Sequence, residues 1–362
     1  MTRPALAVID RAALRHNLNQ VRSIASNCQV MAIVKANAYG HGLVRVARLL
    51  AEDKGVDAFG VACLEEAKVL RAAGVKLPIT LLEGVFEADE YRDAARLGLT
   101  VVIHHPWQAD ALQSTALPWP VSIWLKIDTG MHRLGLPPKT VTSIWERLRT
   151  CRSALLPIGL MTHFACADAR NSPITDRQLA CFRETVSGLS GAWCLANSAA
   201  ILSDSATHGQ WVRPGLMLYG VSPFSNEHAS NLGLRPVMQF TSRLIAINQV
   251  HQGETVGYGG SWICATDTVV GTVAAGYADG YPRHAPSGTK VLVNGRTAPL
   301  VGRVSMDMLC VDLNSHPDAR IGDTVLLWGE GLSVEEIATA ADTIPYELLC
   351  HIAPRVAIEE RN

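Results

Sequence analysis

The sequence predicts an α/β protein in which an N-terminal (β/α)8 barrel, residues 1–233, is followed by a mainly-β domain, residues 234–362. Two observations support this architecture. Short apolar runs alternate with amphipathic segments over the first two thirds of the chain, a pattern typical of a parallel sheet covered by helices. From residue 235 onward helical patterns become scarce, and apolar runs separated by Gly, Pro, Asn and Asp indicate strands and turns.

In the first domain, eight apolar runs have the length of strands, and a helix-like segment follows most of them. We expect them to form the barrel: 30–34, 58–62, 79–82, 100–103, 121–127, 157–161, 193–196 and 211–213. Covering helices are expected at 43–50, 64–73, 88–97 and 175–189. A doubly wound open sheet is the alternative, but no G-x-G-x-x-G fingerprint follows any of these runs. In the second domain we expect strands at 237–250, 268–274, 290–293, 309–313 and 324–328, and a short helix at 333–341.

Composition excludes several classes of protein. Hydrophobic residues at 48% and charged residues at 18% describe a soluble chain with an ample core, and a net charge of −1 gives no electrostatic reason to expect nucleic acid or a membrane as partner. The nine cysteines include no C-x-x-C pair, which favours thiols in a reducing compartment over disulfides or a metal site. The N-terminal apolar run is too short for a signal peptide, and we predict a cytoplasmic protein without a metal.

The run 30–34 ends in Lys35, and a loop of small residues with Tyr39, Gly40 and Gly42 follows. A lysine at the carboxyl end of a buried strand can lose its charge by desolvation, and its neutral amine can then attack a carbonyl group. A lysine that extends its amine into solvent fits the same position equally well.

Further polar residues follow the other strands, and in a barrel all of them face one site at the carboxyl ends of the strands. They are Asp128 and Arg133 in LKIDTGMHRLG, His163 in MTHFA, Asn197 and Ser198 in LANSAA, and Arg213 and Gly215 in VRPGLMLYG. Each has a structural explanation when taken alone: a helix cap, a core histidine or a turn glycine. Their shared rim favours a functional site.

The motif AIVKANAYGHG, residues 32–42, resembles the cofactor-lysine motif of alanine racemases, pyridoxal-phosphate enzymes of the barrel-plus-β-domain type. The resemblance spans nearly the whole chain and implies pyridoxal 5'-phosphate as cofactor, with Lys35 as its Schiff-base lysine and Tyr39 at its phosphate. Arg133 resembles the arginine that contacts the ring oxygen and the substrate carboxylate. Lys126 matches a lysine that many members carry in carbamylated form.

The same resemblance implies that Arg213 faces the ring nitrogen and that His163 supports this arginine. Ser198 and the backbone of Gly215 and Leu216 are implied to bind the phosphate, which agrees with the phosphate site common after the last two strands of such barrels. Asn197 is implied as a further cofactor-binding residue. Two departures stand out. His132 replaces a glycine of many members beside Arg133, and Pro354 replaces a tyrosine that in some members reaches the phosphate.

The second domain carries three further matches, ETVGYGGSW, AAGYADGYPR and VGRVSMDM. By resemblance, Tyr258 is a catalytic base that serves the partner subunit's barrel in a homodimer with shared active sites. Tyr277, Arg283 and Asp168 line the substrate entrance, and the amide at Met306 helps to hold the substrate carboxylate. Taken alone, Tyr258 and its glycines read as a surface aromatic in a turn.

The resemblance implies racemisation of L-alanine and D-alanine by two bases, Lys35 on one face and Tyr258 on the other. It is compatible both with supply of D-alanine as a peptidoglycan precursor and with alanine breakdown. A decarboxylase of the related barrel-plus-β type normally pairs the ring nitrogen with an acid, and a single-barrel cofactor-binding protein lacks the second domain. An amino-acid racemase of broader specificity is the main alternative.

Overall fold

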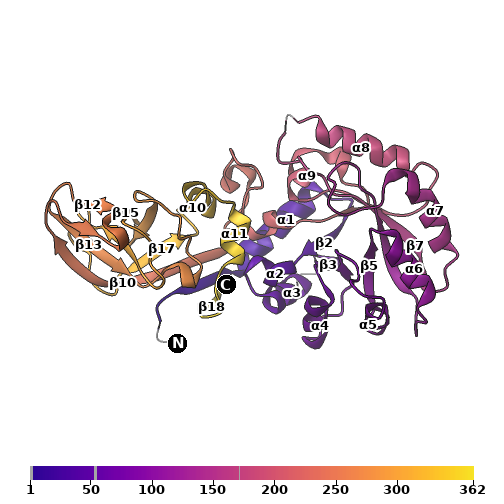
Figure 1. Cartoon of the computed structure of the whole chain (residues 1–362), viewed down its shortest axis with the longest axis horizontal. Helices are drawn as coiled ribbons and strands as arrows, with labels where there is room; N and C mark the ends of the chain where they lie inside the picture. The colour runs from indigo at the N-terminus through magenta and orange to yellow at the C-terminus, as the bar shows by residue number, and fades with distance from the viewer. Residues whose placement is uncertain (1–2, 53–54, 171) are drawn as a thin grey trace.

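The computed structural model describes residues 3–52, 55–170 and 172–362, and it shows two domains arranged end to end in an elongated molecule (Figure 1). Eight parallel strands close into a barrel in chain order, which confirms the predicted fold class. The barrel strands are β2 Gln29–Ile33, β3 Ala58–Val61, β4 Ile79–Leu81, β5 Leu99–Ile103, β6 Val121–Lys126, β7 Ala154–Met161, β8 Trp193–Cys194 and β9 Trp211–Val212. Each overlaps one of the runs predicted from the sequence.

These runs form strands because both faces of a barrel sheet are covered, one by the interior and one by helices. Every residue of β3 and β4 is accordingly buried. The helices of this domain are α1 Arg11–Ile24, α2 Lys35–Tyr39, α3 Leu43–Glu52, α4 Leu64–Ala72, α5 Glu90–Arg96, α6 Pro106–Ser114, α7 Pro138–Arg149, α8 Ile174–Thr185 and α9 Ser198–Ser203. α3 illustrates the covering pattern, because four of its five buried residues recur at helical spacing: Leu43, Val46, Ala47 and Leu50.

The second domain is built on an eight-stranded sheet in the order β13-β16-β15-β14-β17-β10-β1-β18, and β13 also pairs with β10. Its strands are β1 Leu6–Asp10, β10 Met238–Val250, β13 Thr268–Val273, β14 Lys290–Val293, β15 Arg296–Val301, β16 Leu309–Asp312, β17 Thr324–Trp328 and β18 Ala357–Arg361. A separate hairpin joins β11 Thr255–Val256 to β12 Trp262–Ile263, and the helices are α10 Val334–Ala340 and α11 Pro345–Cys350. The five strands and the helix predicted for this region are confirmed.

The N-terminal strand β1 lies in the sheet of the second domain. It pairs antiparallel with β10 and parallel with β18, so both ends of the chain enter one sheet. The predicted boundary at residue 233 assigned β1 to the barrel domain. The pattern of a short strand does not indicate which other strands it pairs with, so this pairing could not be predicted. The division itself stays a prediction.

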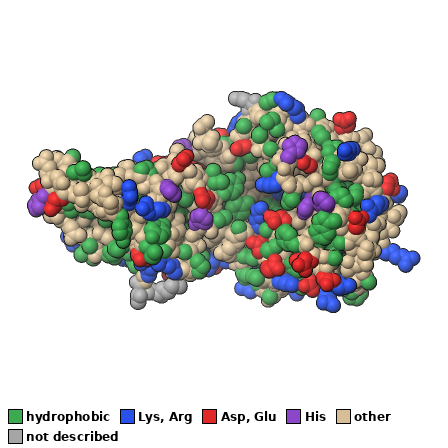
Figure 2. Space-filling view, in the orientation of Figure 1, with side chains coloured by type: hydrophobic (Ala, Val, Ile, Leu, Met, Phe, Trp, Pro, Cys, Tyr) green, Lys and Arg blue, Asp and Glu red, His purple; other side chains and the backbone are tan. Residues whose placement is uncertain are grey.

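Charged side chains of both signs are interspersed on the face that Figure 2 shows, and Lys and Arg side chains lie along the hollow between the two domains.

The nine cysteines are all unpaired thiols. Within the described residues, every helix is too short or too polar to cross a bilayer.

Candidate active site

A cavity of about 730 Å³ opens at the carboxyl ends of the barrel strands. Ten of the residues predicted for the site line it: Lys35, Tyr39, Lys126, Arg133, His163, Asn197, Ser198, Arg213, Gly215 and Leu216. Four of these carry a cationic side chain or an amine, whereas Glu83 is the acidic residue in the lining. The cavity therefore favours an anionic ligand.

Lys35 lies two residues beyond β2 and begins α2 (the lysine turn, Lys35–Tyr39), a single turn with left-handed backbone angles. The φ angles of Ala36, Asn37 and Ala38 are 53°, 54° and 54°, and that of Tyr39 is 51°. Four consecutive non-glycine residues in this region are costly, so the surrounding structure must hold them. Such strain is typical of functional sites, where it aims side chains that regular structure would direct elsewhere.

Neighbouring side chains satisfy the backbone of this turn. Glu66 Oε1 accepts a hydrogen bond from the Ala36 amide at 2.7 Å, and Asn37 Oδ1 accepts from the amide that starts α3 at 2.8 Å. The ring of His41 is buried and contacts the Tyr39 carbonyl oxygen through Nδ1 at 2.8 Å. Burial lowers the pKa of His41 to about 4. The neutral ring therefore carries its proton on Nδ1 and donates it to that carbonyl.

Tyr39 is placed by packing and by a glycine. Its ring stacks on Tyr219 with 4.8 Å between the ring centroids, and burial raises the pKa of its phenol. The phenol thus stays protonated and can donate a hydrogen bond. A Cβ at Gly215 would lie 2.6 Å from the Tyr39 hydroxyl oxygen, so only glycine permits this approach.

Ser198 and the segment after β9 line the cavity beside Tyr39. Ser198 Oγ accepts hydrogen bonds from the amides of Gly215 at 2.9 Å and Met217 at 3.3 Å. Asn197 acts as the N-cap of α9, because its Oδ1 accepts from the Ala200 amide at 3.0 Å. Its predicted structural role is therefore present, and it also lines the cavity.

Arg213 is only 5% exposed, and hydrogen-bond acceptors surround its guanidinium group. It donates to the Thr162 carbonyl at 2.8 Å, the Leu195 carbonyl at 3.1 Å and the carbonyl of Cys194, and it approaches His163 Nδ1 at 3.3 Å. Burial, followed by the charge of Arg213, lowers the pKa of His163 well below its ordinary value. The neutral histidine therefore accepts at Nδ1 and keeps its proton on Nε2.

Lys126 at the end of β6 is 8% exposed and lies among cations. Burial, then the charges of Arg213, Arg133 and Lys35, lower its pKa to about 7. Much of this amine is therefore neutral near neutral pH, and a neutral amine is nucleophilic. This chemistry is what carbamylation by carbon dioxide requires.

His132 does not turn toward the cavity. Its Nδ1 contacts Asp128 Oδ2 at 3.1 Å, and its side chain is 82% exposed. Its φ of 57° lies in the left-handed region, which favours glycine, so a non-glycine residue is strained at this position.

The predicted residues of the second domain do not line this chain's cavity. Tyr258, Tyr277, Arg283 and Met306 are exposed on the β domain, and Tyr258 is 71% exposed. Asp168 is exposed in the loop after β7. Tyr346 of α11 is near this loop: burial and then the charge of Asp168 raise the pKa of its phenol.

Sequence reasoning missed the contribution of α11. Ile344, Tyr346 and Cys350 line the cavity from this segment, whereas Pro354 is not among the lining residues. α11 packs closely on the lysine turn, since a Cβ at Gly40 would lie 2.0 Å from the Leu349 carbonyl oxygen. No local pattern in the sequence signals this contact between distant segments.

Comparison with known proteins agrees with this geometry. The family of alanine racemase N-terminal domains matches residues 9–223, and the family of alanine racemase C-terminal domains matches residues 237–359. The alanine racemase of Pectobacterium atrosepticum is 49% identical over 355 residues, 98% of both chains. A relative from Escherichia coli named as a biosynthetic alanine racemase is 48% identical over 356 residues, again 98% of both chains.

Solved structures give the same result. The crystal structure of the biosynthetic alanine racemase from Pseudomonas aeruginosa superposes with a TM-score of 0.96 at 48% identity and covers 100% of both chains. The alanine racemase from Bacillus anthracis, solved with bound L-Ala-P, superposes with a TM-score of 0.89 at 30% identity and covers 100% of this chain and 96% of that one. With two family domains in order and relatives similar along almost its whole length, the chain belongs to the alanine racemase family of isomerases.

Proposed function

We propose that this protein interconverts L-alanine and D-alanine with pyridoxal 5'-phosphate as its cofactor. The observation that carries the proposal is the shared cavity of Lys35, Arg213 and the wall formed by Ser198 and Gly215. An amine for the cofactor aldehyde, a fixed cation for the ring and a phosphate cradle are the groups that this cofactor needs. The close approach of Tyr39 to Gly215 supports the fit, because a larger residue would fill the cradle.

Lys35 would bind the cofactor, and Ser198, Gly215, Leu216 and Tyr39 would hold its phosphate. When bound, the cofactor supplies an electron sink that weakens the Cα–H bond of the substrate. Arg213 would face the ring nitrogen. Arginine does not give up its proton, and the carbonyls around Arg213 hold its charge in place, so the ring nitrogen would stay unprotonated and transamination would be disfavoured.

Racemisation requires removal of a proton on one face of the substrate and return on the other, and therefore two bases. We assign Lys35 to one face and Tyr258 to the other. Arg133 would bind the substrate carboxylate together with the amide at Met306, and Tyr277, Arg283 and Asp168 would line the entrance.

The placement of Tyr258 supports a homodimer with shared sites. Figure 1 shows the β11–β12 hairpin region at the end of the molecule opposite the barrel, so this tyrosine is far from its own chain's cavity. Tyr258, Ile263 and Met306 are exposed apolar or aromatic side chains, which are typical of an uncovered interface. In a two-fold dimer each β domain would deliver Tyr258 to the other barrel.

One experiment tests the proposal. Reduction of the purified protein with borohydride should attach the cofactor covalently to Lys35, as read by peptide mass spectrometry. In a separate sample that has not been reduced, incubation with single L-amino acids in deuterium oxide should give inversion and Cα–H exchange for alanine. A label on another lysine would contradict the cofactor assignment, and equal turnover of larger amino acids would favour the broader-specificity racemase.

A further inference from the structure

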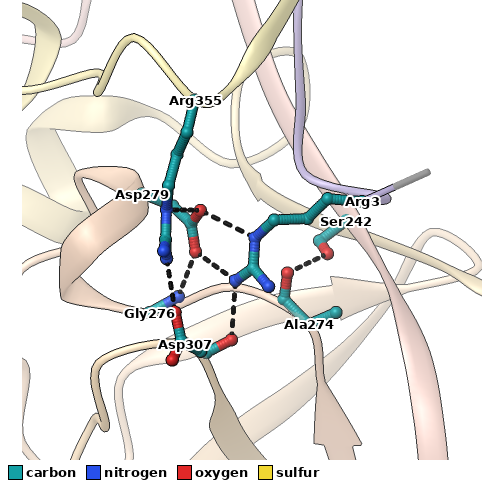
Figure 3. A network of polar contacts seen from close by, with 7 residues as sticks. All are labelled: Arg3, Ser242, Ala274, Gly276, Asp279, Asp307 and Arg355. Atoms are coloured by element: carbon teal, nitrogen blue, oxygen red, sulfur yellow. Dashed lines mark hydrogen bonds and ion pairs between the residues drawn. The ribbon is translucent and has the colours of Figure 1, made fainter. Parts of the chain in front are cut away.

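Asp279 is a buried acid at the end of the short turn Tyr277–Asp279, and two arginines from opposite ends of the chain clamp it (Figure 3). Its side chain is fully buried. Arg3 binds it in a fork, with Nε 2.9 Å from Oδ1 and Nη2 2.6 Å from Oδ2. Arg355 Nε donates to Oδ1 at 2.8 Å.

Each oxygen of the Asp279 carboxylate accepts two hydrogen bonds. The Gly276 amide adds a fourth donor, at 2.9 Å from Oδ2, so both oxygens accept twice. Burial opposes ionisation of Asp279, but the hydrogen bonds from Arg3 and Arg355 outweigh it and lower the pKa of Asp279. The charged carboxylate is therefore the form that the site holds.

The same arginines reach a second loop. Arg3 Nη2 donates to the Asp307 carbonyl at 2.8 Å, and Arg355 Nη2 donates to Asp307 Oδ1 at 2.7 Å. With two arginines and two aspartates, the charges of the cluster balance. Asp307 directly follows Met306 in the chain.

Backbone contacts join the two loops into one unit. The Tyr277 amide donates to the Ser305 carbonyl at 3.1 Å, and the Ala278 amide donates to the Met306 carbonyl at 3.0 Å. A Cβ at Gly276 would lie 2.3 Å from the Ser305 carbonyl oxygen, so the loops touch without space for a side chain. Any shift of Asp279 must therefore move the segments of Tyr277 and Met306 together.

We propose that Asp279, clamped by Arg3 and Arg355, is a positioning residue that fixes where Tyr277 and Met306 stand. This inference rests on the proposed function, in which the Met306 amide helps to bind the substrate carboxylate and Tyr277 lines the entrance. The clamp also ties the loops to the segment after α11, because the Ala353 amide donates to the Asp279 carbonyl at 3.2 Å. Arg3 thus helps to hold two loops that lie far from it in the sequence.

The test is Asp279→Asn in the intact protein. An amide has one accepting oxygen and places N–H groups against donors, so Arg3 loses one partner, and either Arg355 or the Gly276 amide loses its partner as well. If the Met306 amide binds the carboxylate equally in substrate and transition state, its displacement should raise KM for alanine about tenfold and leave kcat within about twofold. Attachment of the cofactor to Lys35 by borohydride should remain complete.

Arg361→Ala is the matched control. Arg361 pairs with Asp10 at 2.6 Å in the same domain, away from both loops, and its loss should leave KM unchanged. Arg3→Ala serves if Asp279→Asn does not fold, since Arg3 lies near the chain end. It should raise KM about threefold, and Arg3→Lys should recover part of this loss because it keeps one charged donor.

The outcomes separate the two proposals. An active wild type with unchanged KM in Asp279→Asn and Arg3→Ala overturns the positioning role and leaves the proposed function standing. A lower melting temperature with unchanged KM also overturns it, because the cluster then serves stability alone. A wild type that does not racemise alanine overturns both.

Discussion

At the scale of single residues, Arg213 shows how the chain fixes a charge. Carbonyl groups of Thr162, Cys194 and Leu195 accept from its guanidinium, and the neutral His163 ring stands beside it. All of these partners are acceptors, so the environment stabilises a cation and offers an anion no donor. The sequence could predict Arg213 from its place after a barrel strand, but not the acceptors that surround it.

Replacement of Arg213 by Glu tests its proposed role at the ring nitrogen of the cofactor. A carboxyl group there can share a proton with that nitrogen, so racemisation should fall at least tenfold while transamination rises. Pyruvate formed per inverted alanine is the measurement. Arg213→Lys is the control, since it keeps the positive charge and should keep the product ratio near wild type. An unchanged ratio in Arg213→Glu would refute the assignment.

The protonation of the Lys126 amine should make its carbamylation depend on pH. With a pKa of about 7, about half of its amine is neutral at pH 7, against roughly one lysine in a few thousand at the ordinary value. Carbon dioxide combines with the neutral form, so a carbamate on Lys126 should increase as pH rises through about 7 and disappear as pH falls below about 6. Carbon-13 NMR of protein equilibrated with labelled carbon dioxide measures it. A signal that persists in Lys126→Met would place the carbamate elsewhere.

At the scale of elements, the lysine turn and α11 mark the limit of sequence reasoning. The barrel strands could be predicted because parallel strands buried on both faces are continuous apolar runs. The left-handed turn could not be predicted, since no local feature of residues 36–39 favours four consecutive residues with left-handed backbone angles. Contacts with Glu66 and His41 hold the turn, and α11 covers it.

A pair of glycine variants separates backbone strain from packing at this contact. Gly40 and Gly74 have φ of 77° and 86°, but an added Cβ would meet the Leu349 carbonyl oxygen at 2.0 Å in the first and nothing within 4 Å in the second. Gly74→Ala should lower the free energy of unfolding by about 1–2 kcal/mol. Gly40→Ala should lower it by about 3–5 kcal/mol, because overpacking adds to the strain.

Urea unfolding of both variants measures the difference. Gly40→Ala should also bind the proposed pyridoxal phosphate more weakly, since α11 supplies Tyr346 to the cavity wall. Equal destabilisation of the two variants would show that α11 does not depend on the close contact.

At the scale of the whole molecule, the sequence predicted a barrel followed by a mainly-β domain, but it did not predict several of the pairings between strands. β11 and β12 have two residues each, too few for a periodic signal. Pro299 breaks the strand pattern of β15, and β18 ends in three charged residues. β1 and β18 pair across almost the full length of the chain, a contact that local patterns do not encode. The same limit applies to the cavity. Its residues at the ends of the barrel strands were predicted from the sequence, and its residues from α11 were not.

The β11–β12 hairpin, whose loop contains Tyr258, lies at the end of the molecule opposite the barrel (Figure 1), and the Tyr258 side chain is exposed. If a partner's tyrosine completes each site, Tyr258→Phe should slow deuterium exchange into L-alanine more than into D-alanine, with Lys35 serving the other face. Mixing inactive Tyr258→Phe with inactive Lys35→Ala should restore activity. Random exchange makes half of the dimers mixed, each with one intact site of two, so recovery should approach about a quarter of wild type. The double variant mixed with either single variant should stay inactive. If subunits exchange without any recovery, Tyr258 does not act as a base across the dimer.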